Sequence, residues 1–589
     1  MNQEELINSQ KVRSLFFFSF YIILVGIFLY KMAYEAFGDR VLPPQTITSH
    51  DKSIRGKIQT QDGFTVAESS KLYRTYIYAP GIDPNKQELF INLFSIYSGM
   101  DKQSVARRMG DFNRNVILSY QVDSHTAKYL KELSRKFHSL GVYRRIQTGD
   151  GGSLQYRLEV RESGESRDFY YHDTLTPLLG HMTKIDDGGY TRSTGLKGVE
   201  KSYDFELSDG KDGIIQAKRD VRGNMIFDGN SIRNYRQNGY DITLNIDLKL
   251  QKRVEKILDM KKKEYQASEI TAVVMDSLTG RVISFASSNR YNPSNIRQSE
   301  IPYLNPTATE YLYEPGSVIK PISFALLLEH DRVNPLELVN TESGRWNLHG
   351  HTITDENAHD WMSAENTVVF SSNIGTAKLA QRLEGFELYE GYKKYGFAQR
   401  SGIDIPYERV GRIQNITNFN RDIYKATSAY GYGLTTNLMQ LLVANNVFNN
   451  GGYLVQPQVV QKMQKGDQVH TQRIQAQQII PSRVAVQMNR IMQKVVKDGS
   501  AHRAQIKGLT VGGKTGTAHI SVDGVYENLY NSTFIGFAND SESRYTIAVL
   551  TKKPTIPYRH FASLTSVPVF KDIAKQMVEL NILKPKLME

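Results

Sequence analysis

The segment EPGSVIKP, residues 314–321, places Ser317 three positions before Lys320 and follows the lysine directly with Pro321. The next seven residues, ISFALLL at 322–328, are almost wholly apolar and predict a buried helix. Proline lacks an amide hydrogen, so a helix tolerates it best in the first turn, where amides have no intrahelical partner. The sequence therefore predicts a helix that begins at or just before Ser317, with Lys320 one turn behind the serine.

Ser317 and Lys320 have a spacing that puts two side chains on one face of a helix. A serine hydroxyl becomes a nucleophile when a base takes its proton, but a lysine with its usual pKa of about 10.4 is no base. Burial or a second cation nearby lowers that pKa, and free amides at a helix N-terminus can hold an oxyanion. An S-x-x-K pattern alone is a weak signal, because several arise by chance in a chain of this size, and by itself it favours an ordinary helix surface.

A second motif, K-T-G-T at residues 514–517, follows Val-Gly-Gly and predicts an edge strand. Glycine in such a strand lets another backbone come close, and an extended peptide can pair with a free edge. Lys514 and the hydroxyls of Thr515 and Thr517 have the chemistry to hold a carboxylate. The alternative is a glycine-rich strand bend around Gly516.

A third motif, S-x-N at residues 371–373, stands at another predicted helix start. Ser371 is suited to relay a proton between Lys320 and Lys514, and Asn373 to hydrogen-bond a substrate amide. The alternative is a serine that caps the helix and an incidental asparagine.

The order S-x-x-K, S-D-N, K-T-G is the motif set of class A β-lactamases and penicillin-binding proteins, and this chain, with S-x-N in place of S-D-N, resembles the penicillin-binding proteins. The wider sequence resembles the division-specific, FtsI-type class B members over most of residues 50–589. The resemblance is carried by YEPGSVIKP (313–321), SSNIGTAKLA (371–380), GYGL (431–434), TFIGFA (533–538), RGKI (55–58) and GLKGVE (195–200). Residues 61–63 (QDG) and 169–182 depart from the family's pattern, which bears on the choice between a division and an elongation role.

The resemblance implies a serine D,D-transpeptidase that crosslinks peptidoglycan stem peptides ending in D-Ala-D-Ala, uses no cofactor and is acylated by β-lactams. Ser317 is the implied nucleophile and Lys320 its base, while Ser371 and Lys514 pass a proton to the leaving nitrogen. Asn373 orients the donor amide, and the amides of Ser317 and Thr517 form the oxyanion hole. The substrate-binding residues carried over are Thr515, Gly516 and Thr517.

Three alternatives stay open beside this prediction. An elongation-specific class B transpeptidase would share the chemistry and differ in partners. A β-lactamase would need a water-activating glutamate or a carbamylated lysine. A membrane β-lactam sensor would keep the fold without crosslinking. The implied partners are a SEDS-family glycosyltransferase and division proteins.

The loop at residues 349–360 (HGHTITDENAHD) is rich in possible metal ligands. His349, His351, Asp355 and His359 are of the right residue types. The chain has no helical H-E-x-x-H pattern, and the loop lies between the first two motifs, where the family varies. We therefore predict no metal site.

The N-terminus carries 17 uncharged residues at 14–30, SLFFFSFYIILVGIFLY, with no small-residue cleavage site after them. This pattern predicts an uncleaved membrane anchor. A short N-terminal tail favours a cytoplasmic start with the bulk of the chain outside the inner membrane, in the periplasm. The chain has no cysteine, and its net charge of +12 comes without the basic-aromatic modules of nucleic-acid binders.

The 589 residues predict several domains with an α+β fold. Strand patterns at 73–79 and 154–160 and helix patterns at 86–100, 104–112 and 125–137 give a mixed first region, an elongated pedestal by resemblance. Two distant hairpins, at 270–286 and 533–550, flank a long helical insert and predict one antiparallel sheet packed between helices. The predicted parts are a tail (1–13), an anchor (14–31), a pedestal (45–240), a connector (241–264) and a transpeptidase domain (265–589).

Overall fold

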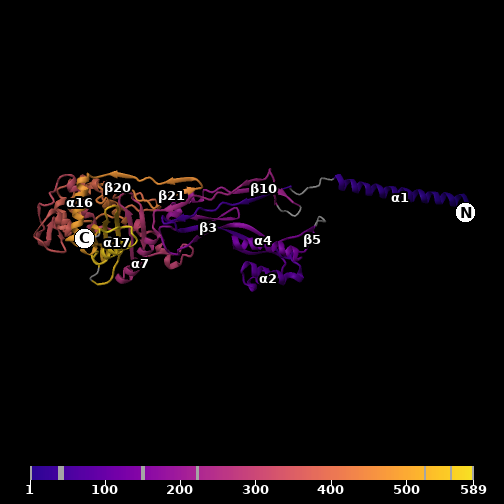
Figure 1. Ribbon diagram of the computed structural model, residues 1–589, viewed down its shortest axis with the longest axis horizontal. Helices are drawn as coiled ribbons and strands as arrows, with labels where there is room; N and C mark the ends of the chain where they lie inside the picture. The colour runs from indigo at the N-terminus through magenta and orange to yellow at the C-terminus, as the bar shows by residue number, and fades with distance from the viewer. Residues whose placement is uncertain are drawn as a thin grey trace. The chain divides into compact units, whose positions relative to one another are not determined.

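A computed structural model describes residues 3–37, 45–147, 153–220, 225–522, 525–557 and 560–586. Its contacts divide the chain into two units (Figure 1). One comprises residues 1–53 and 211–237, and the other comprises residues 54–210 and 238–589. The three motifs S-x-x-K, S-x-N and K-T-G-T all lie in the second unit.

The first unit contains the N-terminal helix and a small sheet. Helix α1 (Gln3–Phe37) includes the apolar segment found in the sequence, and over Ile7–Phe37 it is long and apolar enough to cross a membrane. It extends beyond the predicted anchor, 14–31, because the polar residues on both sides continue the helix. The sheet has β10 (Gly213–Arg219) paired with β1 (Thr46–Asp51), β11 (Met225–Ile226) and β12 (Ile232–Asn234).

The second unit contains a nine-stranded sheet built from distant parts of the sequence. Strand β3 (Thr65–Tyr78) pairs with β2, β4 and β7, and β13 (Asp241–Leu244) pairs with β2 and β21. The remaining bounds are β2 (Ile58–Gln59), β4 (Asn115–Asp123), β7 (Glu159–Phe169), β8 (Met182–Asp187), β9 (Tyr190–Gly195), β21 (Val460–Lys465) and β22 (Gln468–Thr471). The sheet therefore includes strands that precede and follow the first two catalytic motifs.

Helices α2 (Gln87–Ser98), α3 (Lys102–Met109) and α4 (Ser124–Ser139) confirm the three helices expected in this region. The strand expected at 154–160 is wrong for residues 155–158, while Leu154 ends β6 and residues 159–160 begin β7. Only Ser153–Leu154 form β6, which pairs with β5 (Ile146–Gln147). The following residues pack instead of forming a ladder: the Tyr156 ring lies 4.5 Å from that of Tyr78, and the Leu158 amide donates to the Tyr143 hydroxyl.

The predicted antiparallel sheet between two distant hairpins is confirmed. It has five strands in the order β15 (Val282–Ser287), β14 (Glu269–Asp276), β26 (Arg544–Lys552), β25 (Val525–Asn539) and β24 (Thr510–Val522). Strands β14 and β26 are neighbours although about 270 residues separate them. Strand β24, which carries K-T-G-T, is at one edge, as the glycine pattern predicts.

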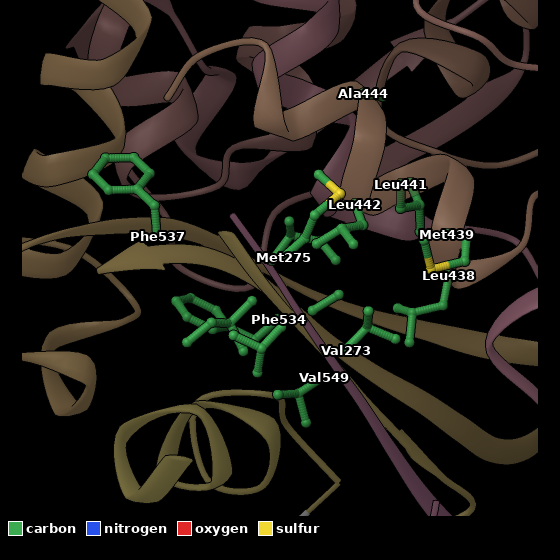
Figure 2. Packing of buried hydrophobic residues seen from close by; sticks show 14 of the residues in the cluster. Val273, Met275, Leu438, Met439, Leu441, Leu442, Ala444, Phe534, Phe537 and Val549 are labelled. Atoms are coloured by element: carbon green, nitrogen blue, oxygen red, sulfur yellow. The ribbon is translucent and has the colours of Figure 1, made fainter. Parts of the chain in front are cut away.

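Helices cover both faces of this sheet. Phe534 and Phe537 point to opposite faces in Figure 2, where Phe537 is on the side of α15 (Leu438–Asn446). The Phe534 ring packs on Phe570 of α17 (Ser566–Glu579), with centroids 4.9 Å apart. Helix α7 (Leu248–Tyr265) contacts α17, β14 and β15. This buried sandwich fixes the position of the edge strand.

The helical insert between the hairpins carries the other two motifs. Its central helix, α9 (Lys320–Glu329), is buried at every residue except Glu329. The surrounding helices are α8 (Thr307–Glu310), α10 (Ala364–Val369), α11 (Asn373–Ala380), α12 (Gly385–Lys394), α13 (Ile416–Phe419), α14 (Asp422–Ala429) and α16 (Ser482–Lys497).

Candidate active site

Ser317 lies in a 3-10 turn, η4 (Gly316–Ile319), and Lys320 is the first residue of α9. Helical backbone therefore begins just before the serine, as Pro321 predicts, but in the tighter geometry. In a 3-10 turn the side chains at i and i+3 eclipse each other. Ser317 and Lys320 thus share one face, with the serine half-buried and the lysine fully buried.

Lys320 joins the first motif to the second. Its Nζ donates to the Ser371 carbonyl at 2.6 Å, to Ser371 Oγ at 3.2 Å and to Asn373 Oδ1 at 2.8 Å. Burial holds the pKa of Lys320 well below its usual range, and the charge of Lys514 lowers that pKa further. The lysine is therefore suited to act as a base.

Lys514 is the second buried cation of the site. It projects from β24, and its Nζ donates to the Thr515 carbonyl at 3.1 Å. Burial lowers the pKa of Lys514 to about 7, against the opposing influence of Glu356. A group with this pKa exchanges its proton readily at neutral pH.

The S-x-N turn has a strained backbone. Ser371 has a φ of 62°, in the left-handed region that non-glycine residues seldom adopt. The helix cap of α11 is Ser372, whose Oγ accepts from the Gly375 amide at 2.8 Å. The capping role weighed for Ser371 from the sequence therefore belongs to its neighbour, which leaves the Ser371 hydroxyl at Lys320.

Asp355 holds this turn in place. Its carboxylate accepts from Ser372 Oγ at 2.5 Å and from the amides of Asn373 and Ile374 at 2.5 and 3.0 Å. The Asn373 side chain is fixed at its other end, where Nδ2 donates to the Thr354 carbonyl at 2.9 Å. The loop considered for a metal thus supplies the brace of the second motif.

That loop forms no metal cluster within the described part of the chain. His349 faces Asp422, with Nε2 3.1 Å from Oδ2, and Asp355 is used by the S-x-N turn. Glu356, which the sequence did not single out, acts on the pKa values of both Lys320 and Lys514. Glu356 stands next to Asp355 in a polar loop, and nothing in the spacing of the loop's residues indicated that it would act on the two lysines.

Gly516 brings the third motif against the serine turn. A Cβ at this glycine would lie 3.0 Å from the Pro315 carbonyl oxygen and 3.1 Å from the Val318 amide nitrogen. A side chain here would push the turn and the strand apart, so glycine suits this close approach. It places Ser317 beside the edge strand, where the amides proposed for the oxyanion hole come from the turn and from Thr517.

Both threonine hydroxyls of the third motif have partners. Thr515 Oγ1 lies 2.7 Å from Ser500 Oγ, and Thr517 Oγ1 accepts from the Ala562 amide at 3.1 Å. Because Thr517 accepts in that contact, its own hydroxyl hydrogen stays available for a ligand.

Glu314 is a further residue that the sequence analysis did not assign. It accepts from the Gly433 amide at 2.8 Å and from the Tyr526 hydroxyl at 3.0 Å. Burial raises the pKa of Glu314. The residue ties the segment before Ser317 to the G-Y-G-L segment and to β25.

Comparison with known proteins covers most of the chain. Residues 270–575 match the family model "Penicillin binding protein transpeptidase domain", and residues 50–244 match "Penicillin-binding Protein dimerisation domain". Two similar proteins are the probable peptidoglycan D,D-transpeptidases PenA of Neisseria gonorrhoeae and PbpC of Pseudomonas aeruginosa. Both are 30% identical over 70% of this chain, which is 68% of PenA and 70% of PbpC.

The FtsI protein of Buchnera aphidicola subsp. Baizongia pistaciae, named a peptidoglycan D,D-transpeptidase, is 27% identical over 80% of this chain and 76% of its own. Among solved structures, penicillin-binding protein 2X of Streptococcus thermophilus superposes with a TM-score of 0.74 at 19% identity, covering 91% of this chain and 81% of its own. At that identity the superposition establishes a shared fold.

Proposed function

Since this chain belongs to the penicillin-binding proteins, as a class B peptidoglycan D,D-transpeptidase of the FtsI type, we propose that Ser317 is its nucleophile and that the enzyme acts at the division septum. The observation that carries the site assignment is the convergence of three motifs. Lys320 Nζ contacts Ser371 and Asn373, while Gly516 packs against the turn that holds Ser317.

In the acylation step, Lys320 Nζ takes the proton of the Ser317 hydroxyl as Oγ bonds to the penultimate carbonyl carbon of the donor stem. The amides of Ser317 and Thr517 hold the oxyanion that forms. The bond to the terminal D-alanine then breaks, and Ser371 and Lys514 return a proton to the leaving nitrogen. Thr515 and Thr517 hold the carboxylate of that D-alanine.

In the second step, the amine nitrogen of a neighbouring stem bonds to the acyl carbon and gives a proton to the lysines. The ester bond to Ser317 then breaks, and the lysines return a proton to Ser317 Oγ. A cavity of about 830 Å³ adjoins the loop that contains Gly433, whose amide donates to Glu314. Apolar atoms make up much of its surface, as in other ligand sites, and eight lining residues also carry hydrogen-bonding groups that suit a second stem peptide. They are His349, Gln414, Asn418, Asn420, Arg421, Asp422, Tyr424 and Thr427.

Penicillin labelling of the full-length protein tests the nucleophile. Ser317→Ala is expected to reduce covalent labelling by roughly a thousandfold or more, because no other hydroxyl takes the place of the lost one. Ser294→Ala, an exposed serine of the same domain, is the matched control and should label normally. If Ser317→Ala labels like the wild type, another residue is the nucleophile.

The fate of the label separates the open alternatives. A transpeptidase holds the acyl group and releases D-alanine from stem peptides in exchange for an amine, whereas a β-lactamase hydrolyses the adduct rapidly. A sensor labels but crosslinks nothing. Rapid turnover of penicillin, or labelling without amine exchange, would each replace the proposed function by the corresponding alternative.

The septal role and the partners rest on the FtsI-type family. We expect α1 to anchor the chain with its bulk outside the inner membrane. Residues 45–240 would then serve as the pedestal and residues 265–589 as the transpeptidase domain. The expected partners are a SEDS-family glycosyltransferase and division proteins. Depletion should give filamentous cells, whereas round swollen cells would indicate elongation. If a reporter that works only in the cytoplasm is active when fused after α1, the bulk of the chain lies inside and the expected topology is wrong.

A further inference from the structure

A cavity of about 960 Å³ opens on the transpeptidase domain away from the serine. It lies between α16, the 3-10 turn η6 (His502–Ala504), the start of β24 and α17. Thr510 and Val511 line it, so it stands at the end of β24 that precedes the K-T-G-T motif. None of the residues proposed for catalysis is among its described lining residues.

The lining of this cavity is strongly basic. Among its described residues are six lysine and arginine side chains and no aspartate or glutamate, and His502 adds a further hydrogen-bonding group. The six are Arg490, Lys494, Lys497, Lys507, Lys571 and Lys575. We call this the basic cavity.

The sequence builds the basic cavity from regular spacing. On α16 the cations stand at 490, 494 and 497, and on α17 at 571 and 575, so each helix presents its row on one face. Like charges at this spacing destabilise a helix. Two such rows and Lys507 surround the same hollow. Four of the six side chains are exposed, so solvent screens part of their repulsion, and a bound anion would remove more of it.

The helix dipole explains only part of this arrangement. Lys494 and Lys497 lie in the last turn of α16, where cations are favourable. Lys571 and Lys575 lie before the last turn of α17, which carries no basic residue. Their clustering therefore has another reason.

Compensating carboxylates are scarce around the cavity. Of the six cations, Lys494 alone has an ion pair within the part of the chain that the structure describes, with Glu365. The nearby acids of α17 are engaged elsewhere, since Asp572 faces Lys261 and Glu579 faces Arg253. The other five cations therefore have no carboxylate partner in that part of the chain and are available to bind an anion.

Five of the six cations are lysines, which act as compact point charges and bind phosphate without the planar geometry that favours arginine for carboxylates. The volume matches that of small-molecule sites, and several cations in one hollow require several negative charges. We propose that the basic cavity binds an anion with two or more closely spaced phosphate groups, either free or in a lipid headgroup.

Calorimetric titration of the full-length protein in neutral detergent with sodium tripolyphosphate tests this site. Lys571→Gln with Lys575→Gln should weaken binding about tenfold, and added salt should weaken it further. Lys249→Gln with Lys256→Gln, two exposed lysines on α7, makes the same charge change outside the cavity and should leave affinity unchanged. If thermal unfolding shows that the double variant is not folded, Lys507→Gln in the loop replaces it. Its affinity for tripolyphosphate is expected to fall about threefold.

Nanodiscs separate the two sources of phosphate. Weaker tripolyphosphate binding in cardiolipin discs than in phosphatidylcholine discs identifies a headgroup as the natural occupant, and equal binding identifies a free anion. Absence of binding overturns the proposal. Citrate binding as tightly as tripolyphosphate, or equal losses in the cavity and α7 variants, also overturns it in favour of general attraction to the net charge of +12.

Discussion

Two buried lysines are the proposed acid and base of the site. Both Lys320 and Lys514 are withdrawn from water, and the charge of Lys514 adds to the depression of the Lys320 pKa. Their pKa values are therefore coupled, and the proton that one gains alters the other. In the proposed mechanism, acylation proceeds best when Lys320 is neutral and Lys514 is protonated.

This coupling predicts a bell-shaped pH dependence of penicillin acylation. Since the pKa of Lys514 is lowered to about 7, the protonated form disappears as pH rises through 7. The rate constant should then fall about tenfold per pH unit, whereas the rising limb at lower pH reports loss of the Lys320 proton. The measurement is the second-order labelling rate with a fluorescent penicillin.

Lys514→Arg is the decisive variant for this profile, because arginine stays charged over the whole range. Its falling limb near pH 7 should vanish, whatever its maximal rate, and Lys249→Gln should keep the wild-type profile. A wild-type rate that climbs steadily to pH 9 would show that Lys514 does not supply the proton.

At the scale of elements, glycines let the segments of the site approach one another. Gly431 has a φ of 100°, and its carbonyl accepts from the Gly316 amide at 3.1 Å. A Cβ at Gly431 would lie 2.0 Å from the Gly316 carbonyl oxygen. The G-Y-G-L segment therefore fixes the η4 turn from one side, while Gly516 of β24 fixes it from the other.

Gly431→Ala should displace the backbone beside Ser317 and reduce the penicillin acylation rate at least tenfold. Gly451→Ala is a matched control, since Gly451 also has a positive φ, 85°, but has no atom within 4 Å of an added Cβ. Both variants incur backbone strain of about 1 kcal/mol, and thermal unfolding measures it. Equal acylation rates in the two variants would refute the packing argument.

At the scale of the whole molecule, a buried ionic network links segments that are far apart in the sequence. Glu200 in α5 (Gly198–Ser202) accepts from Nε of Arg55 and from Nε of Arg167, each at 2.8 Å. Burial lowers the pKa of Arg167, and Glu200 opposes that effect. The network packs within the second unit beside β2 and β7.

Glu200→Gln should cost about 3–5 kcal/mol of unfolding free energy, because it leaves two buried guanidinium groups without their shared carboxylate. Glu542→Gln breaks the exposed pair with Lys584 and should cost less than about 1 kcal/mol. Urea unfolding followed by fluorescence compares the two. Similar small losses would mean that water or nearby Asp204 replaces the missing charge.

The sequence by itself determined the order of the three motifs, the start of the serine helix and the two hairpins of the central sheet. Pro321 limited where the helix begins, and Val-Gly-Gly before Lys514 indicated an edge strand. These predictions succeed because chain geometry and side-chain periodicity act over a few residues. The same local signals failed at residues 155–158, where packing of Tyr156 on Tyr78 replaced strand pairing.

Only the tertiary structure decided what makes the motifs chemically active. The burial of Lys320 and Lys514, the brace from Asp355 and the influence of Glu356 depend on neighbours 17 to 194 residues away. The joining of β21 to β13 in one sheet is of the same kind. Desolvation and close approach arise when distant segments pack together, so a linear pattern supplies the side chains and the fold sets their pKa values.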